Sequence, residues 1–188
     1  MGRLVYSGIA SLDGCTVDAD GRFDWAAPDA EVHAFVNDLE RPVGTYLYGR
    51  RMWEVLRYWE TAPTTADADT HEVAADYARI WQAADKVVHS TTLGELDSPR
   101  ARLETSFDPV AVRAMVDASE RDVSIGGPTL AAEALRAGIV DDVHLLLHPV
   151  AVGGGTRVFP DGLRVDLDLV EQRRFAGGVV HLRYTVRR

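Results

Sequence analysis

The stretch Ser124-Ile125-Gly126-Gly127-Pro128-Thr129 joins an apolar strand to a helix. The strand is expected at residues 122–125, and helical spacing continues to Arg136, after which Gly138 ends the helix. Two glycines between the carboxyl end of a strand and a helix place backbone N–H groups where they can hold a pyrophosphate. A tight turn with a proline at the helix start is the alternative interpretation. The spacing is not G-x-G-x-x-G, so a conventional dinucleotide-binding fold is not predicted.

On both sides of this stretch, apolar strands alternate with helical segments. Strands are expected at 4–12, 43–48, 86–89, 103–107, 122–125, 143–152, 166–174 and 179–186. Helices are expected to begin at Pro28-Asp29, Gly49 and Asp108-Pro109, and another is expected over 66–84. Residues 16–24 are expected to form a loop or a short hairpin. The alternation predicts an α/β fold with a mostly parallel central sheet, to which the last two strands add an antiparallel hairpin.

Length and composition narrow the class of protein. The 188 residues are 46% hydrophobic, which favours a single domain over residues 1–188 with a sizeable core. A formal net charge of −9 argues against nucleic acid or an anionic membrane as partner. No apolar run approaches the roughly 20 residues of a membrane helix, and Cys15 is the only cysteine, so a cytoplasmic location is expected. The six histidines show no spacing typical of a metal site.

Two further segments at strand ends carry groups that bind anions. Gly49, Arg50 and Arg51 lie where a strand meets a helix, so the arginines could clamp a phosphate. Ser90 and Thr91 follow another strand, and their hydroxyls could donate hydrogen bonds to a phosphate. The alternatives are that the arginines are solvated surface residues and that the hydroxyls cap nearby backbone. The protein is acidic overall, so three local segments that carry anion-binding groups are unexpected by chance. Together they favour a bound anionic nucleotide.

The order of these motifs suggests a family. The set Ser11-Leu12-Asp13-Gly14, Gly49-Arg50-Arg51-Met52, Ser90-Thr91, Gly126-Gly127-Pro128 and Gly153-Gly154-Gly155 runs over nearly the whole chain. It resembles the dihydrofolate-reductase-like superfamily, and more closely the branch that contains the C-terminal reductase domain of riboflavin biosynthesis. The resemblance implies a three-layer fold and NADPH-dependent hydride transfer to a small pteridine-like or pyrimidine-like heterocycle.

The resemblance also implies roles for individual residues. Gly49, Arg50 and Arg51 would meet the adenosine-side phosphates of NADPH, and Ser90 and Thr91 its 2′-phosphate. The pyrophosphate would lie on Gly126, Gly127, Pro128 and Thr129, and the nicotinamide beside Ala10. Relatives in this branch are typically dimers, so a homodimer is expected. The chain lacks the complete pterin-binding pattern and the deaminase domain that often accompanies the riboflavin reductase, so the substrate stays open.

Proton transfer and substrate contact have fewer candidates. Asp13, Asp29 and Glu31 are the candidate proton-transfer residues near the first helix, and Trp25 is a candidate wall of the substrate pocket. Alternatively, Asp13 orders its own turn and Trp25 packs on the core. Two rival functions remain: a nucleotide-binding module without turnover, and the same fold with a flavin or deazaflavin.

Overall fold

The computed structural model describes residues 1–67 and 71–188. The strands are β1 Leu4–Ser11, β2 Cys15–Val17, β3 Val43–Gly49, β4 Asp85–His89, β5 Ala101–Glu104, β6 Asp122–Gly126, β7 Asp142–His148, β8 Thr156–Arg157, β9 Leu167–Arg174 and β10 Val180–Val186. The helices are α1 Ala30–Glu40, α2 Arg50–Leu56, α3 Glu72–Ala83, α4 Pro109–Ala118 and α5 Pro128–Arg136, with short 3-10 turns η1 Asp24–Ala26 and η2 Arg57–Glu60.

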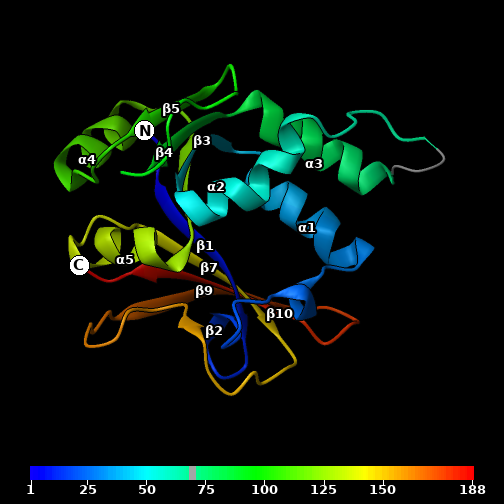
Figure 1. The fold of residues 1–188 in the computed structure, drawn as a ribbon. Helices are drawn as coiled ribbons and strands as arrows, with labels where there is room; N and C mark the ends of the chain where they lie inside the picture. Colours follow the sequence, from blue (N-terminus) through cyan, green and yellow to red (C-terminus); the bar gives the residue numbers. More distant parts are fainter. Residues whose placement is uncertain (68–70) are drawn as a thin grey trace.

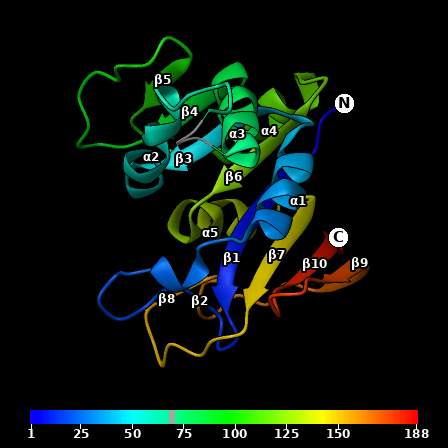
Figure 2. The ribbon, with the colours of Figure 1, turned by 90° about the vertical axis from the view of Figure 1, so that its right-hand side faces the viewer.

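Eight strands form one twisted sheet in the order β5-β4-β3-β6-β1-β7-β10-β9. The six strands from β5 to β7 pair in parallel, and β10 pairs antiparallel with both β7 and β9. In Figure 2, β1 and β7 run side by side in the same direction. Both chain termini lie toward the end at which these two strands begin. The prediction of a mostly parallel sheet with a C-terminal antiparallel hairpin is therefore confirmed.

Helices cover both faces of the sheet, which gives three layers (Figure 1). Alternate residues of β3 show the two cores: Leu47 packs with the residues of α4 and α5, whereas Tyr46 and Tyr48 pack with Trp53 of α2 and Trp81 of α3. α1 lies on the same side as α2 and α3 and packs its own apolar face on β7 and the end of the β9–β10 hairpin.

Two predicted helix starts have the expected caps. The Asp108 carboxylate accepts N–H groups of the first turn of α4, and Pro109 follows as the first helical residue. The Asp29 carboxylate accepts the Val32 N–H at 2.9 Å and so caps α1. Each aspartate satisfies a backbone donor that the helix itself cannot pair.

The predicted helix over 66–84 is too long. α3 covers Glu72–Ala83, and residues 61–67 are not helical. Residues 68–70 of that prediction lie outside the described part of the chain. The segment before α3 is rich in threonine and aspartate, whose short polar side chains compete with helical hydrogen bonds.

Two strand predictions need correction. The strand predicted at 143–152 ends at His148, because Pro149 has no N–H to donate to a ladder. The strand predicted at 103–107 is β5, Ala101–Glu104, whose pairing stops where β4 stops, at His89 opposite Glu104. Residues 16–24, expected to form a loop or a short hairpin, follow the loop alternative from 18 onward, whereas β2 pairs with the distant β8.

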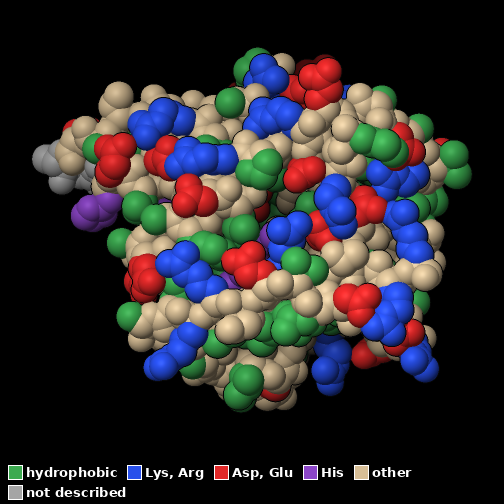
Figure 3. Space-filling view, turned by 180° about the vertical axis from the view of Figure 1, so that it is seen from behind, with side chains coloured by type: hydrophobic (Ala, Val, Ile, Leu, Met, Phe, Trp, Pro, Cys, Tyr) green, Lys and Arg blue, Asp and Glu red, His purple; other side chains and the backbone are tan. Residues whose placement is uncertain are grey.

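Ion pairs hold the amino ends of the central strands. Asp142 at the start of β7 is 1% exposed and receives Arg3 at 2.6 Å and Arg183 at 3.4 Å. Side chains of both charge signs also lie next to one another over the back of the molecule (Figure 3). The residues that the sequence analysis singled out lie at the opposite end of the sheet, at the carboxyl ends of the parallel strands.

Candidate functional site

Strand order brings the three predicted phosphate-binding segments together. β4, β3 and β6 are parallel neighbours, so their carboxyl ends meet at one edge of the sheet. Gly49 pairs with His89, the residue before Ser90, and Tyr48 pairs with Gly126. Ligands of open α/β sheets bind at this edge.

At Gly126-Gly127, just before α5, the backbone passes close to side chains of β3 and α2. A Cβ on Gly126 would lie 3.1 Å from the Tyr48 ring and 3.2 Å from the Met52 side chain, so only glycine fits there without displacement. Gly127 has φ +91, a left-handed conformation that favours glycine, and it is the N-cap of α5. Pro128 is the first helical residue and Thr129 is exposed beside it. The first N–H groups of α5 therefore remain available for an anion.

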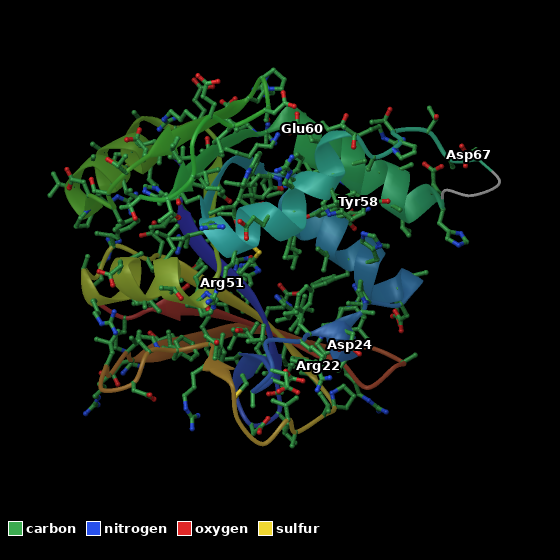
Figure 4. All side chains as sticks on the ribbon, viewed as in Figure 1. Arg22, Asp24, Arg51, Tyr58, Glu60 and Asp67 are labelled. Carbon is green, nitrogen blue, oxygen red and sulfur yellow. The ribbon has the colours of Figure 1, made fainter. Side chains whose placement is uncertain are left out.

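Arginine and hydroxyl side chains border this turn. Arg50 donates from Nη1 to Thr92 Oγ1 at 3.0 Å and from Nε to Glu54 Oε1 at 2.7 Å, which connects α2 to the loop after β4. Arg51 is exposed and extends below the first turn of α2 in Figure 4. Ser90 Oγ accepts the Thr92 and Leu93 N–H groups, so it caps its own turn, as the alternative interpretation has it.

These residues fit a phosphorylated dinucleotide. The turn leaves no room for a Cβ at Gly126. Arg50 and Arg51, which border the turn, are exposed and are not held in buried ion pairs. Thr91 is likewise exposed, next to Ser90. Ala10 lies at the end of β1, opposite Leu147 of β7, and is fully buried.

The Ser11–Gly14 turn is tied to the glycine loop that follows β7. The Asp13 carboxylate accepts the Val152 N–H at 3.0 Å and the Gly153 N–H at 2.7 Å. A hydrogen bond from the Ser11 hydroxyl, followed by these two N–H groups, lowers the Asp13 pKa to about 2. Asp13 therefore stays ionised at neutral pH and holds the turn against the loop, the structural role that sequence reasoning kept as the alternative.

Asp29 and Trp25 belong to the segment that joins β2 to α1. Asp29 is exposed, caps α1 and lies against Gly177, where a Cβ would come within 2.8 Å of its Oδ2. Trp25 belongs to η1 and is half-buried, and its ring meets that of His148 edge to face at 5.8 Å. Trp25 Nε1 is buried, and no hydrogen-bond partner for it exists among the described residues.

Sequence reasoning missed several residues of this edge. Met52 and Tyr48 shape the glycine turn, Thr92 contacts Arg50, and His148 ends β7 beside Ser11. His148 has no role in the sequence-based predictions, because none of the six histidines has a spacing typical of a metal site. The signal that could have found it is its position: a histidine directly before a proline, at the end of a long apolar strand.

Other features of the described residues carry no ligand assignment. A shallow depression of about 310 Å³ between α1 and α3 is bordered by Arg41, Asp76 and Arg79, which pair with one another. It lies away from the strand ends and its charged groups are satisfied. Within residues 1–67 and 71–188 there is no cluster of His, Cys, Asp and Glu side chains suited to a metal ion. The same residues form no helix that is both long and apolar enough to span a membrane.

A mostly parallel sheet, helices on both faces and an antiparallel C-terminal hairpin define a dihydrofolate-reductase-like fold, with three segments that carry candidate anion-binding groups at the carboxyl ends of its strands. The family model of the RibD C-terminal domain matches residues 3–181. The chain belongs to that family, and the resemblance seen in the sequence is confirmed.

One curated relative and two solved structures are similar to this chain over most of its length. The uncharacterized protein YyaP of Bacillus subtilis is 26% identical over 185 residues, covering 97% of this chain and 94% of its own. A putative riboflavin biosynthesis protein from Shewanella sp. PV-4 has a TM-score of 0.74 at 18% identity and covers 99% of both chains. A pyrimidine reductase-like protein from Corynebacterium diphtheriae has a TM-score of 0.68 at 15% identity, covering 100% of this chain and 92% of its own. At these identities the solved structures show the fold.

Proposed function

We propose that this protein is an NADPH-dependent reductase of a small pteridine-like or pyrimidine-like heterocycle. The observation that carries the proposal is the meeting of three segments with candidate anion-binding groups at the carboxyl ends of neighbouring strands. Membership of the RibD C-terminal domain family supports a reductase, and one solved neighbour is described as a pyrimidine reductase-like protein.

Each segment would hold a different part of the cofactor. The N–H groups at Gly126, Gly127 and Thr129 would bind the pyrophosphate, and Arg50 and Arg51 the adenosine-side phosphates. Ser90 and Thr91 would donate to the 2′-phosphate, with Ser90 keeping its turn through the same oxygen. Bound in this way, the cofactor supplies a hydride. The protein would position the nicotinamide beside Ala10 and the heterocycle against it, exclude water and provide one proton.

Binding of the cofactor can be tested without a known substrate. NADPH should raise the melting temperature, and NADH should raise it less, because it lacks the phosphate that Ser90 and the arginines would bind. Arg50→Ala and Arg51→Ala should each weaken NADPH binding about 10-fold to 100-fold, the range of a charged hydrogen bond. Arg100→Ala is the matched control: Arg100 is also an exposed arginine, paired with Asp85 at 2.9 Å, but it lies near the start of β4.

Equal stabilisation by NADPH and NADH, or none by either, would contradict this assignment. Asp13 and Asp29, two of the candidate proton-transfer residues, are both hydrogen-bonded to backbone N–H groups. This favours a second candidate function, a nucleotide-binding module without turnover. That function predicts NADPH binding with no oxidation of NADPH by pterins, pyrimidines or quinones. Stabilisation by FMN or a deazaflavin in place of NADPH would favour the flavin-type alternative. A cytoplasmic location is part of the same proposal.

A further inference from the structure

His148 lies at the substrate end of the sheet and has no role in the assignments above. It ends β7 and pairs with Ser11, one residue beyond the Ala10–Leu147 pair. Side chains alternate along a strand, so His148 is on the face that Leu146 presents to α1. Its side chain is nearly buried, at 4% exposed. The imidazole therefore lies next to the point of β1 where the proposed function places the reacting ring.

Neighbouring side chains pack against the His148 ring, but no carboxylate of the described residues forms a hydrogen bond with its nitrogens. The edge of Trp25 packs against it, and within the described residues no hydrogen bond joins the imidazole to another side chain. The carboxylates on the adjacent elements are Asp13, Asp24, Asp29 and Glu31. Asp13 is turned to the Val152 and Gly153 N–H groups, Asp29 caps α1, and Glu31 pairs with Arg173 and the Ala176 N–H.

The reaction needs a proton donor; Asp13, Asp29 and Glu31 are engaged in the contacts above, and Asp24 is exposed to solvent at the start of η1. When a ring C=N bond is reduced, a hydride adds to the carbon, the π electron pair moves to the nitrogen, and that nitrogen takes up one proton. Asp13 stays ionised at neutral pH, and Asp29 is occupied at the helix start. We propose, on the basis of the proposed function, that His148 donates this proton and that Trp25 is the positioning residue for its ring. The neutral imidazole then regains a proton from water.

A pH dependence follows from this role. Burial lowers the pKa of His148 below its usual value of 6.5, and no charged neighbour contributes to the shift. A proton donor has to be protonated, so kcat/KM should fall about tenfold for each pH unit above that pKa. The rate should therefore be highest on the acid side of neutrality.

His148→Gln tests the proposal, with His144→Gln as matched control. His144 lies on the same face of β7, about 13 Å further back along the strand. NADPH oxidation is measured from pH 5 to 9 with lumazine or 7,8-dihydropterin, and NADPH thermal shifts are recorded for each variant. We expect His148→Gln to lose about 100-fold or more in kcat and the acid-side pH dependence, with the NADPH shift retained. His144→Gln should keep the rate and its pH profile. Trp25→Phe should restore much of the rate that Trp25→Ala loses.

A second measurement uses the wild-type protein and needs no turnover. The ring nitrogens of His148 are followed by NMR in 15N-histidine protein with NADP⁺, before and after lumazine is added. A shift of the His148 resonances on adding lumazine is expected. If NADP⁺ binds and lumazine leaves His148 unchanged, or if His148→Gln keeps the wild-type rate and pH profile, the His148 proposal is wrong while the cofactor assignment stands. If neither NADPH nor NADP⁺ binds, the proposed function fails first and His148 with it.

Discussion

At the scale of single residues, Glu40 is an ionisable group buried away from the site. It lies at the end of α1, 8% exposed, and its Oε2 has no partner within the described residues. Asn37 Oδ1 and Trp81 Nε1, on the same side of the sheet, are likewise buried without a hydrogen-bond partner among the described residues. Burial, only partly offset by Tyr46, raises the pKa of Glu40 to about 7. Glu40 is therefore largely protonated in the folded protein below neutral pH.

This pKa predicts how stability depends on pH. The folded state binds the Glu40 proton more tightly than the unfolded chain, whose value is 4.5. The stabilisation is complete below pH 4.5 and is lost as pH rises through 7, a change of about 3 kcal/mol. Glu40→Gln stays neutral, so its free energy of unfolding at pH 8 should exceed that of wild type. Denaturant unfolding at pH 5 and pH 8 measures the difference.

Glu133→Gln is the control for this prediction. Glu133 is an exposed residue of α5 paired with Arg136 at 3.1 Å, and such a surface pair contributes at most about 1 kcal/mol. The interpretation of Glu40 fails if Glu40→Gln and wild type lose equal stability between pH 5 and pH 8.

At the scale of elements, the site depends on how α5 begins. Gly127 has φ +91 at the N-cap, a conformation that costs a residue with a Cβ about 1–2 kcal/mol. Gly127→Ala should lower the melting temperature and also weaken NADPH binding, because relief of the strain turns the N–H groups away from the phosphate. Gly138→Ala, at φ +67 beyond the other end of α5, should lower stability and leave the NADPH shift unchanged. Thermal unfolding with and without NADPH separates the two effects, and equal loss of NADPH binding in both variants would contradict the role of Gly127.

α4 offers a stability test that is independent of function. Asp108→Ala removes the cap that accepts the Val110 N–H at 2.9 Å, and should cost about 1 kcal/mol. Asp108→Asn keeps a good capping group and should cost much less. Denaturant unfolding compares the two. Equal loss in both variants would mean that the charge of Asp108, rather than its capping hydrogen bond, stabilises α4.

At the scale of the whole molecule, the two edges of the sheet differ. β5 at one edge has four residues, whereas β9 at the other has eight and exposes Leu169 at 55% and Val170 at 54%. A long edge strand with exposed apolar residues is open to pairing with another chain.

The expected homodimer stays a prediction, and β9 is the edge at which we would test it. Light scattering at micromolar concentration should give the mass of two chains. Val170→Lys should shift the protein toward a monomer, because a lysine on an edge strand opposes pairing. Val110→Lys is the control, since Val110 is 78% exposed but lies on α4. A monomer in the wild-type protein would contradict the prediction, and dissociation by both variants would argue against β9.

Much of the fold could be predicted because its signals act over a few residues. An aspartate caps the next turn of its own helix, as Asp29 and Asp108 do, and the glycines before Pro128 set a local backbone angle. Alternating apolar strands and helices then leave few arrangements besides a layered parallel sheet. The errors, at 66–84, 103–107 and 143–152, are in element ends, where pairing with a distant strand or a proline decides the last residue.

The sequence by itself determined the α/β class, the starts of α1, α2, α4 and α5, and the glycine turn at Gly126-Gly127. Only the tertiary structure decided that β6 lies between β3 and β1, that Asp13 binds the loop at Gly153, and that Trp25 packs on His148. These relations join residues far apart in the sequence, from 78 positions for Tyr48 and Gly126 to 140 positions for Asp13 and Gly153. They depend on which faces pack together and in what register, and the total burial of side chains sets this rather than any local propensity.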